Sequence, residues 1–403
     1  MKIRHVVIVV QENRTTDNLF NGLTGANTVR YGKNSNGKTV PLLPEPLTAP
    51  YRVGHSHDAF NIDYSNGKMN GFDLAPSSCM PEAPPSQCPP QSRRAYGYVP
   101  RDETRPYWQM AKDYAFADEM FQSNQGPSFP AHQYIVSGTS TIADGATLKA
   151  SENPGSLKGC GAPQGATVRT IDPQGRENHW VFPCFDRTSI FTSLDARGIG
   201  WRYYMVNPIY NAVRPLKPIW DNQLEYRANV RTPPWKFLRD VRADVLTGVT
   251  IVTPTRKSSD HAGATDGTGP SWVAAVVNAV GHSKYWNSTA IFVTWDDWGG
   301  WYDHVTPKIF NSYELGFRVP LLVISPYAKP HYVSHKRYEF GSILKFVENN
   351  FGLPSLGTTD ARANDLSDMF NFTQKPIKFK TIRAPQAEGY FVRQPADDGS
   401  LDD

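Results

Sequence analysis

Two acidic side chains end a strand-like run in the second half of the chain. The run Ile291-Phe-Val-Thr-Trp295 is apolar and rich in β-branched and aromatic residues, which is typical of a buried strand. Asp296 and Asp297 follow it directly, and then a Gly-Gly pair. Two carboxylates at the tip of a buried strand repel each other and lose hydration unless a cation lies between them. The pair indicates a cation site; the alternative is two surface acids before a turn.

A second polar pair follows the first strand-like run of the chain. Residues 3–10 are almost all β-branched and predict a central strand, and Glu12 and Asn13 come just after it. The carboxyl ends of parallel strands meet at one edge of a sheet, where open α/β folds bind their ligands. We therefore expect Glu12 and Asn13 to lie beside Asp296 and Asp297. Such an all-oxygen set suits Ca²⁺, Mg²⁺ or Mn²⁺ better than zinc.

Ser128 lies in the segment Gly126-Pro-Ser-Phe-Pro130. Pro130 fits the first turn of a helix, so we expect Ser128 at a helix N-terminus. The free N–H groups and the dipole of a helix N-terminus favour an anion such as phosphate. A plain helix cap is the alternative. The segment lacks the G-x-S-x-G pattern, which disfavours an esterase of the α/β-hydrolase class.

Four histidines in polar segments are candidates for acid-base work or substrate contact. His55 and His261 lie in loop-like stretches, and His304 follows Asp303 close behind the acidic pair. His179 lies in an irregular region and is the weakest candidate. The alternative for each is a surface or hydrogen-bonded histidine. We expect Asp17 and Asp303 to orient their neighbours. No role is assigned to the remaining candidates His132, His282, His331 and His335.

Composition excludes some classes of partner and compartment. The 403 residues carry a net charge of only +4 with no run of basic residues, which argues against nucleic-acid binding. No apolar stretch approaches the roughly 20 residues of a membrane span. Met1-Lys-Ile-Arg-His5 leads straight into the first expected strand. We therefore expect either a cytoplasmic protein or one whose leader has been removed.

The cysteines favour the second of these alternatives. Cys79 and Cys88 flank a proline-rich loop, and Cys160 and Cys184 bracket another loop-like region. No pair has the C-x-x-C spacing of a zinc or redox site. We expect the disulfides Cys79–Cys88 and Cys160–Cys184, and with them a secreted or periplasmic location. Four free thiols, other pairings and a cytoplasmic location stay open.

Strand-like and helix-like runs alternate along the chain. This pattern predicts one α/β domain over residues 1–403 with a mainly parallel sheet. We expect insertions near 24–100 and 140–188 to form a cap over its carboxyl edge. The other expected strands are 201–206, 249–253 and 317–325, and 115–120 is expected to be a short strand or the end of a helix. The expected helices are 107–114, 189–197, 232–245, 271–280 and 338–351, and 214–223 is expected to be a loop.

These motifs resemble those of a phosphoesterase family that holds bacterial phospholipases C and a secreted acid phosphatase, within the alkaline-phosphatase-like superfamily. The resemblance runs over about residues 3–353, and it implies a three-layer α/β/α sandwich. The matching motifs are His5–Phe20, Asn66–Met69, Gly126–Pro130, Thr294–Val305 and Arg318–Pro326.

The resemblance also implies roles for the candidate residues. Ser128 would be the nucleophile, forming a phospho-serine, and would also contact one divalent metal ion. His261 or His304 would protonate the leaving alcohol. The implied metal ligands are Glu12, Asn13, Ser128, Asp296 and Asp297, and the implied substrate contacts are Asn13, His55 and His179. Relatives in the superfamily use zinc, so zinc stays open beside Ca²⁺, Mg²⁺ and Mn²⁺.

Departures from the pattern favour the acid-phosphatase branch. Many phospholipase members resemble this chain but have threonine at Ser128 and glutamate at Asp297. Residues 338–342 lack the usual acid-histidine pair, and we expect none of the extra C-terminal β domains that phospholipase members often carry. We therefore expect a phosphomonoesterase acting on a small phosphate ester. The alternatives are a phospholipase C-type diesterase with peripheral lipid contact, and a non-catalytic binder of phosphate or headgroups. Oligomeric state is left open.

Overall fold

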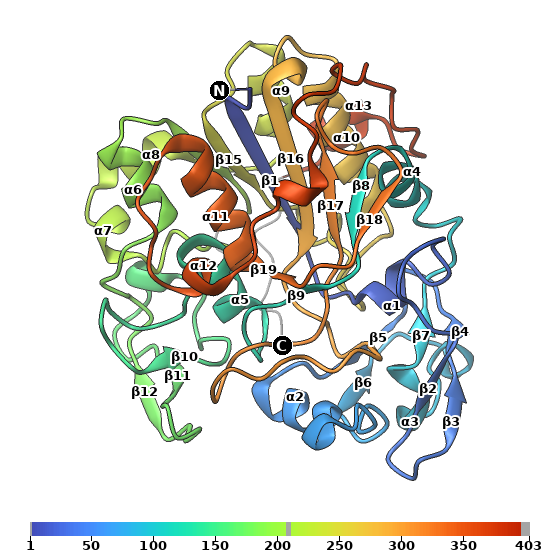
Figure 1. Cartoon of the computed structure of the whole chain (residues 1–403). Helices are drawn as coiled ribbons and strands as arrows, with labels where there is room; N and C mark the ends of the chain where they lie inside the picture. Colours follow the sequence, from blue (N-terminus) through green and yellow to red (C-terminus); the bar gives the residue numbers. More distant parts are fainter. Residues whose placement is uncertain (1, 207–210, 396–403) are drawn as a thin grey trace.

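An eight-stranded sheet forms the centre of the molecule, with the strand order β14-β13-β15-β1-β16-β17-β8-β18 (Figure 1). The computed structural model describes residues 2–206 and 211–395. Seven strands run in one direction, and β17 is antiparallel to both of its neighbours. The mainly parallel sheet is as predicted. Its strands are β1 (His5–Gln11), β8 (Ala115–Ala117), β13 (Trp201–Tyr204), β14 (Val230–Arg231), β15 (Val249–Val252), β16 (Thr289–Trp295), β17 (Leu321–Ile324) and β18 (Tyr332–Ser334).

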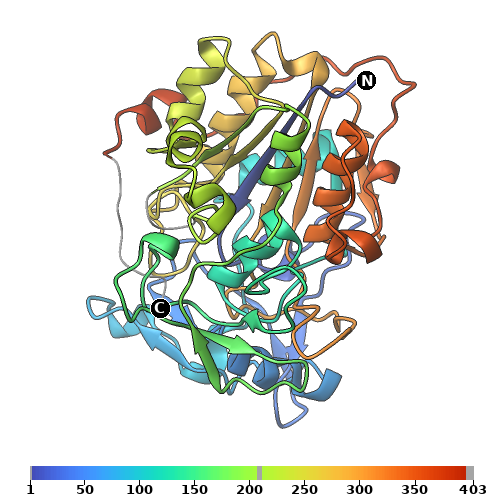
Figure 2. The ribbon, with the colours of Figure 1, turned by 90° about the vertical axis from the view of Figure 1, so that its left-hand side faces the viewer.

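Helices cover both faces of this sheet, which gives the three-layer α/β/α sandwich that was expected (Figures 1 and 2). On one face α5 (Ser128–Ser137) contacts α6 (Ile190–Ala196) and α11 (Phe340–Phe351), and α11 contacts α12 (Thr359–Arg362). On the other face α10 (Gly269–Gly281) contacts α4 (Arg105–Asp113), α9 (Lys236–Arg242) and α13 (Glu388–Val392). The predicted helices are present to within a few residues.

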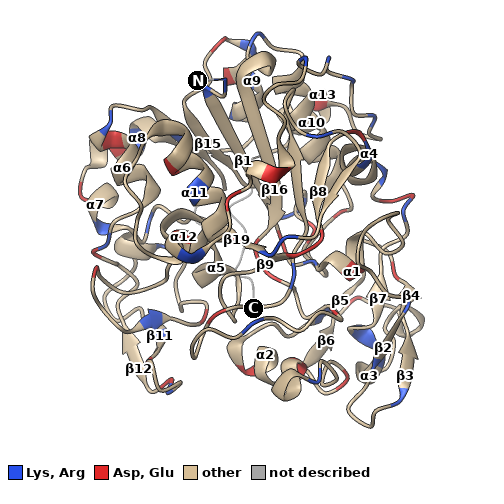
Figure 3. Cartoon of the chain, viewed as in Figure 1, with Lys and Arg blue, Asp and Glu red and all other residues tan. Residues whose placement is uncertain are grey.

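The register between β1 and β16 brings the two polar strand ends together. Both strands lack charged residues and are buried almost throughout, so they form a parallel pair at the centre of the core. Figure 3 shows no Lys, Arg, Asp or Glu on these two strands. Gln11 lies opposite Trp295 at the last pair of the ladder. Glu12 and Asp296 therefore leave the sheet side by side at its carboxyl edge, as the sequence predicted.

The two insertions lie beyond this edge, in the lower half of Figure 1. The division into one domain with these insertions stays a prediction. The first insertion contains β2 (Tyr31–Lys33), β3 (Thr39–Pro41), β4 (Leu43–Pro44), β5 (Tyr51–Val53), α2 (His57–Tyr64), β6 (Ser77–Cys79), α3 (Gln91–Arg94) and β7 (Gly97–Tyr98). The second holds an antiparallel sheet of β10 (Lys149–Ala150), β11 (Val168–Ile171) and β12 (His179–Val181). Short remaining elements are α1 (Thr16–Leu19), β9 (Met120–Phe121), α7 (Lys217–Trp220), α8 (Gln223–Asn229) and β19 (Tyr338–Glu339).

Two short helices replace loops that we expected. The Ser56 side chain accepts a hydrogen bond from the backbone N–H of Ala59, and this cap starts α2. Pro218 occupies the first turn of α7, where its missing N–H is not needed. Both helices are too short to show a clear hydrophobic period, which explains why the sequence did not predict them.

Both predicted disulfides, Cys79–Cys88 and Cys160–Cys184, are present. They staple the two insertions and leave no free cysteine in the described part of the chain. Within residues 2–206 and 211–395, none of the helices combines the length and the apolar character that crossing a bilayer requires.

Candidate active site

Asn13, which follows β1, has an unusual backbone conformation and packs against the turn that follows β16. Asn13 has a positive φ of 63°, and Gly299 packs directly against it. A Cβ atom on Gly299 would lie 2.4 Å from the Asn13 carbonyl oxygen, and Gly299 itself has a φ of 61°. Only glycine satisfies both conditions without strain. The Gly-Gly pair behind the acids therefore allows the two strand ends to approach each other.

The orientation of the Asn13 amide follows from a chain of hydrogen bonds. The Val53 carbonyl only accepts, so His55 Nδ1 donates to it across 3.0 Å. In the neutral ring His55 Nε2 is then an acceptor, and Asn13 Nδ2 donates to it across 3.1 Å. This leaves the Asn13 side-chain oxygen, Oδ1, facing away from His55. Oδ1 is buried and has no hydrogen-bond partner among the described residues.

The two carboxylate oxygens of Asp296 have different hydrogen-bonding environments. Oδ1 accepts hydrogen bonds from the backbone N–H of Asn13 at 3.1 Å and of Asp297 at 2.8 Å. Oδ2 is buried and, within the described parts of the chain, accepts no hydrogen bond. Burial, and then the charge of Asp297, raise the pKa of Asp296 to about 6. Asp297 is held in turn by the backbone N–H of Gly299 at 2.7 Å.

Ser128 begins helix α5, as the sequence predicted, and its hydroxyl points at the acids. The Ser128 Oγ lies 3.2 Å from Glu12 Oε2 and 3.1 Å from Asp297 Oδ2. A hydroxyl carries one proton, so it donates to one of these carboxylates at a time. The next backbone N–H of the helix, that of Phe129, donates to Asn153 Oδ1 at 3.0 Å. The first turn of α5 thus lies at the carboxyl edge of the sheet.

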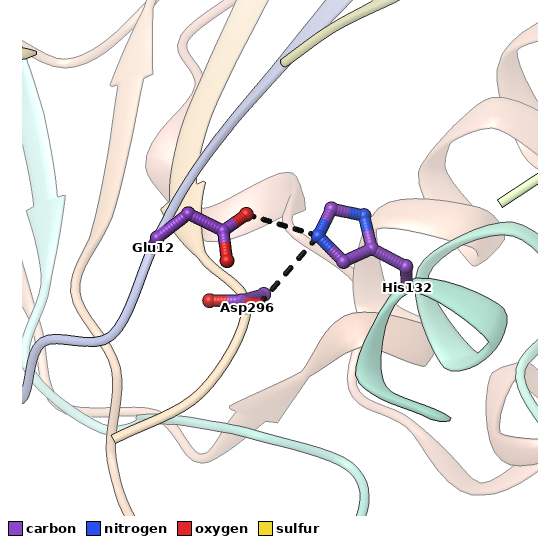
Figure 4. Close-up of side chains that lie close together, drawn as sticks. All are labelled: Glu12, His132 and Asp296. Atoms are coloured by element: carbon purple, nitrogen blue, oxygen red, sulfur yellow. Dashed lines mark hydrogen bonds and ion pairs between the residues drawn. The ribbon is translucent and has the colours of Figure 1, made fainter. Parts of the chain in front are cut away.

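His132 belongs to the same cluster, although the sequence analysis assigned it no role. It lies one turn after Ser128 on α5, so both side chains project from one face of the helix. His132 Nε2 lies 3.1 Å from Glu12 Oε1 and 3.6 Å from Asp296 Oδ2 (Figure 4). The i, i+4 spacing from a candidate nucleophile was the one signal in the sequence that pointed to it.

The donors of this cluster fit a divalent cation. Glu12, Asp296 and Asp297 are fully buried, and the His132 ring forms ion pairs with Glu12 and Asp296 when it carries a proton on both nitrogens. Buried carboxylates are costly unless a cation or donors offset the charge. Two buried oxygen atoms of the cluster, Asn13 Oδ1 and Asp296 Oδ2, have no hydrogen-bond partner among the described residues and could serve as metal ligands. The predicted set of oxygen donors is therefore brought together with one addition, His132.

His55 and His261 form a second wall of the site. Their ring centroids lie 5.8 Å apart in a T-shaped arrangement, and both residues are buried. His261 Nδ1 donates to the Ala262 carbonyl at 2.7 Å, because that oxygen only accepts. The other nitrogen, Nε2, is then the atom that takes up or releases a proton. His55 touches the predicted ligand Asn13, so the pair lies beside the acidic cluster.

The structure places His304 in a different group of side chains. His304 Nδ1 lies 2.6 Å from Asp17 Oδ2, and its Nε2 lies 3.0 Å from Asn27 Oδ1. Arg318 contacts the same Asp17 and also binds Asp303 through its Nε at 3.0 Å. Asp17 contacts His304 and Arg318, and Asp303 contacts Arg318; the orienting role of both acids stays a prediction. The catalytic role of His304 stays a prediction.

His179 lies on β12, in the small sheet of the second insertion. The residue is exposed, and its backbone carbonyl accepts a hydrogen bond from the Thr170 hydroxyl at 3.2 Å. The structure does not bring its side chain into the cluster around Ser128 in the way that it brings His132. The proposed substrate contact of His179 stays a prediction.

Comparison with known proteins places the chain in a family. A model of the Phosphoesterase family matches residues 3–354, so the chain belongs to the Phosphoesterase family and is a phosphoric ester hydrolase. The resemblance drawn from the sequence motifs is thereby confirmed.

Several curated relatives have similar sequences. The chain is 26% identical to phospholipase C A of Mycobacterium tuberculosis, over 93% of this chain and 78% of the relative. It is 25% identical to a non-hemolytic phospholipase C of Pseudomonas aeruginosa, over 92% of this chain and 57% of the relative. Among solved structures, a protein in the alkaline phosphatase superfamily from Vibrio parahaemolyticus gives a TM-score of 0.40 with 11% identity, over 93% of this chain and 75% of that one.

Proposed function

We propose that this protein is a metal-dependent phosphodiesterase of the phospholipase C type, with Ser128 as its nucleophile. The observation that carries the proposal is the Ser128 hydroxyl between Glu12 and Asp297 at the first turn of α5. Two relatives that cover most of this chain are phospholipases C, which supports the diesterase over the monoesterase. Those names outweigh the departures at Ser128 and Asp297 that favoured an acid phosphatase.

The first step transfers the phosphoryl group to the enzyme. A divalent cation held by Glu12, Asn13, Asp296 and Asp297 would lower the pKa of the Ser128 hydroxyl and neutralise charge on the phosphate. The Ser128 proton passes to one of the two carboxylates that contact Oγ, and Oγ attacks phosphorus. The bond from phosphorus to the leaving alcohol breaks as the new Oγ–P bond forms. The N-terminus of α5 favours the resulting anionic phospho-serine.

His261 then serves as the acid and later as the base. With Nδ1–H bonded to the Ala262 carbonyl, a protonated His261 donates its Nε2 proton to the leaving alkoxide. The neutral ring next takes a proton from water, and the hydroxide so formed attacks phosphorus. The Oγ–P bond breaks, Ser128 Oγ recovers its proton from the carboxylate, and the phosphate ester is released. His55 holds the Asn13 amide in position during both steps. His304 and His179, which we expected to protonate the leaving group and bind substrate, stay as secondary candidates.

The natural substrate under this proposal is a phosphodiester with a lipid or a small alcohol as its leaving group. The two disulfides support a secreted or periplasmic location, because such bonds persist in oxidising compartments. We propose peripheral contact with lipid and no role for nucleic acid. Residues 1–403 are proposed to act as one domain, whose insertions cover the carboxyl edge of the sheet.

Replacing Ser128 by alanine tests the proposed nucleophile. We expect Ser128→Ala to lose at least about 1,000-fold in turnover of a chromogenic phosphocholine diester, because the alanine has no oxygen to attack phosphorus. Ser137→Ala is the matched control, since Ser137 is a buried serine at the other end of the same helix. Turnover near the wild-type rate in Ser128→Ala would disprove the nucleophile.

The choice of substrate tests the rest of the proposal. The same wild-type protein is assayed with a phosphomonoester and with the diester, after chelation and with each metal added back singly. Preference for the monoester would restore the acid-phosphatase alternative. No turnover of either substrate with any metal would support the non-catalytic binder.

A further inference from the structure

We propose that His132 is itself a metal ligand, so that the site is a mixed nitrogen and oxygen site that prefers Mn²⁺, Fe²⁺ or Zn²⁺ to Ca²⁺ or Mg²⁺. This inference rests on the metal dependence of the proposed function but not on its substrate. It changes the prediction from the sequence, in which every ligand was an oxygen atom. An imidazole ligand suits transition ions, whereas all-oxygen sets suit Ca²⁺ and Mg²⁺.

The spacing of the donor atoms supports the proposal. Donors about 2.0 to 2.2 Å from one ion lie roughly 3 to 3.5 Å from each other. His132 Nε2 lies 3.1 Å from Glu12 Oε1 and 3.6 Å from Asp296 Oδ2. The oxygen donors predicted from the sequence show the same spacing, since Ser128 Oγ lies 3.2 Å from Glu12 Oε2 and 3.1 Å from Asp297 Oδ2. His132 Nε2 thus takes a place in the donor set equivalent to that of the Ser128 hydroxyl.

The local structure holds this nitrogen in place without help from a loop. His132 and Ser128 lie one turn apart on α5, and every residue of that helix is buried. Figure 4 shows the imidazole reaching from α5 toward Glu12, just after β1, and Asp296, just after β16. One nitrogen therefore bridges the ends of both central strands. Asp296 Oδ2, the farther of its two partners, accepts no hydrogen bond within residues 2–206 and 211–395.

The proton balance of binding is simple. Facing two carboxylates, His132 Nε2 carries a proton and donates it toward Glu12 Oε1. A ligating imidazole is neutral and offers its lone pair, so in the metal-bound form Nε2 carries no proton and the ring keeps one on Nδ1. Glu12 Oε1, which accepted the hydrogen bond from that nitrogen, becomes a second ligand atom for the same ion.

The competing explanation is that His132 only orients Glu12 through a hydrogen bond. Glutamine at position 132 separates the two roles, because its side-chain NH₂ can still donate to Glu12 but is a poor metal ligand. An orienting residue would be replaced by glutamine with little loss of metal affinity. A ligand would not.

The experiment uses the full chain, freed of metal and loaded with one equivalent of Mn²⁺. Pulsed electron paramagnetic resonance should detect a ¹⁴N nucleus coupled to the ion in the wild type and not in His132→Gln. In calorimetric titrations His132→Gln should bind Mn²⁺ about 10- to 100-fold more weakly, with little change for Ca²⁺. The matched control is His5→Gln, a histidine at the opposite end of β1 from Glu12 that contacts the Thr247 carbonyl and should keep the nitrogen signal.

Each outcome decides the question. No nitrogen coupling in the wild type, coupling that survives in His132→Gln, or unchanged Mn²⁺ affinity in that variant would overturn the proposal. If His132→Gln does not fold, His132→Asn provides the same comparison with a shorter side chain. Ser128→Ala should lose turnover yet keep the nitrogen signal, so failure of the proposed function and failure of this inference give different results.

Discussion

The described part of the chain contains two buried groups of acids, and their negative charge is balanced in different ways. One contains Glu12 and Asp296 with His132, and the other contains Asp17 and Asp303 with His304; each offers three potential ligand atoms within 4.8 Å of one another. In the second group, burial lowers the pKa of Arg318, but Asp303 and Asp17 more than offset this and raise it above its usual range. A fixed guanidinium thus supplies positive charge there.

In the first group the ion pairs join Glu12 and Asp296 to His132, which is charged only when its ring is protonated. Two oxygen atoms beside it, Asn13 Oδ1 and Asp296 Oδ2, lack a hydrogen-bond partner in the described parts of the chain. A cluster of acids is therefore a poor guide to a metal site unless its charge balance is also known. The protein balances the second group with its own side chain, whereas under our proposal a metal ion balances the first. Three substitutions test this difference.

Removing the guanidinium should have the largest effect. Arg318→Met leaves Asp17 and Asp303 buried and without their cation, and we expect it to lower the free energy of unfolding by about 3 to 5 kcal/mol. Urea unfolding of the metal-free protein measures the loss. Arg105→Met is the control, because the Arg105–Asp102 pair is exposed and such pairs contribute about 0 to 1 kcal/mol. Equal losses in the two variants would mean that Arg318 does not balance the second group.

A methyl group added at Gly299, against the Asn13 backbone, should have an intermediate effect. Gly299→Ala places a Cβ against the Asn13 backbone and strains a residue at positive φ, so we expect a cost of about 2 to 4 kcal/mol and weaker metal binding. Gly37→Ala shares the positive φ but has open space around the new Cβ, so it should cost about 1 kcal/mol and leave metal binding unchanged. Urea unfolding and metal titration give both quantities. Unchanged metal affinity in Gly299→Ala would show that Asn13 is not positioned by this contact.

The smallest expected effect is a pH dependence at His304. Burial lowers the pKa of His304, but its hydrogen bond to Asp17 and the Asp17 charge more than offset this and raise the pKa above 6.5. A raised folded-state pKa contributes stability that is complete below the unfolded value and is lost as pH rises through the folded value. The free energy of unfolding of the wild type should therefore exceed that of His304→Gln by a larger margin at pH 6 than at pH 9. The two margins should differ by less than about 1 kcal/mol.

An NMR titration of the His304 ring checks the direction of this shift. In an Asp17→Asn background the pH trend should disappear, because the charge that raises the pKa is gone. A His304 pKa below 6.5 in the wild type would contradict the charge balance assigned to the second group.

Much of the fold follows from local patterns. The runs that became β1 and β16 are continuous apolar stretches, and the polar residues behind them mark where each strand ends. The start of α5 was predictable from Pro130. The predicted strand at 317–325 is shorter in the structure, where β17 spans Leu321–Ile324. Its antiparallel direction depends on which neighbours it pairs with, and a single strand carries no record of that.

By itself, the sequence determined which donors stand at the ends of strands, since a polar residue after a buried run is a local feature. Glu12, Asn13, Asp296 and Asp297 were all found in this way. Only the tertiary structure decided that His132 joins them, because its contact with Glu12 spans 120 positions and depends on how α5 packs over the edge of the sheet. It likewise decided the direction of the Asn13 amide, which the tautomer of His55 sets through the Val53 carbonyl. The ends of strands can be predicted from local composition, whereas charge balance and donor orientation arise only when distant segments pack together.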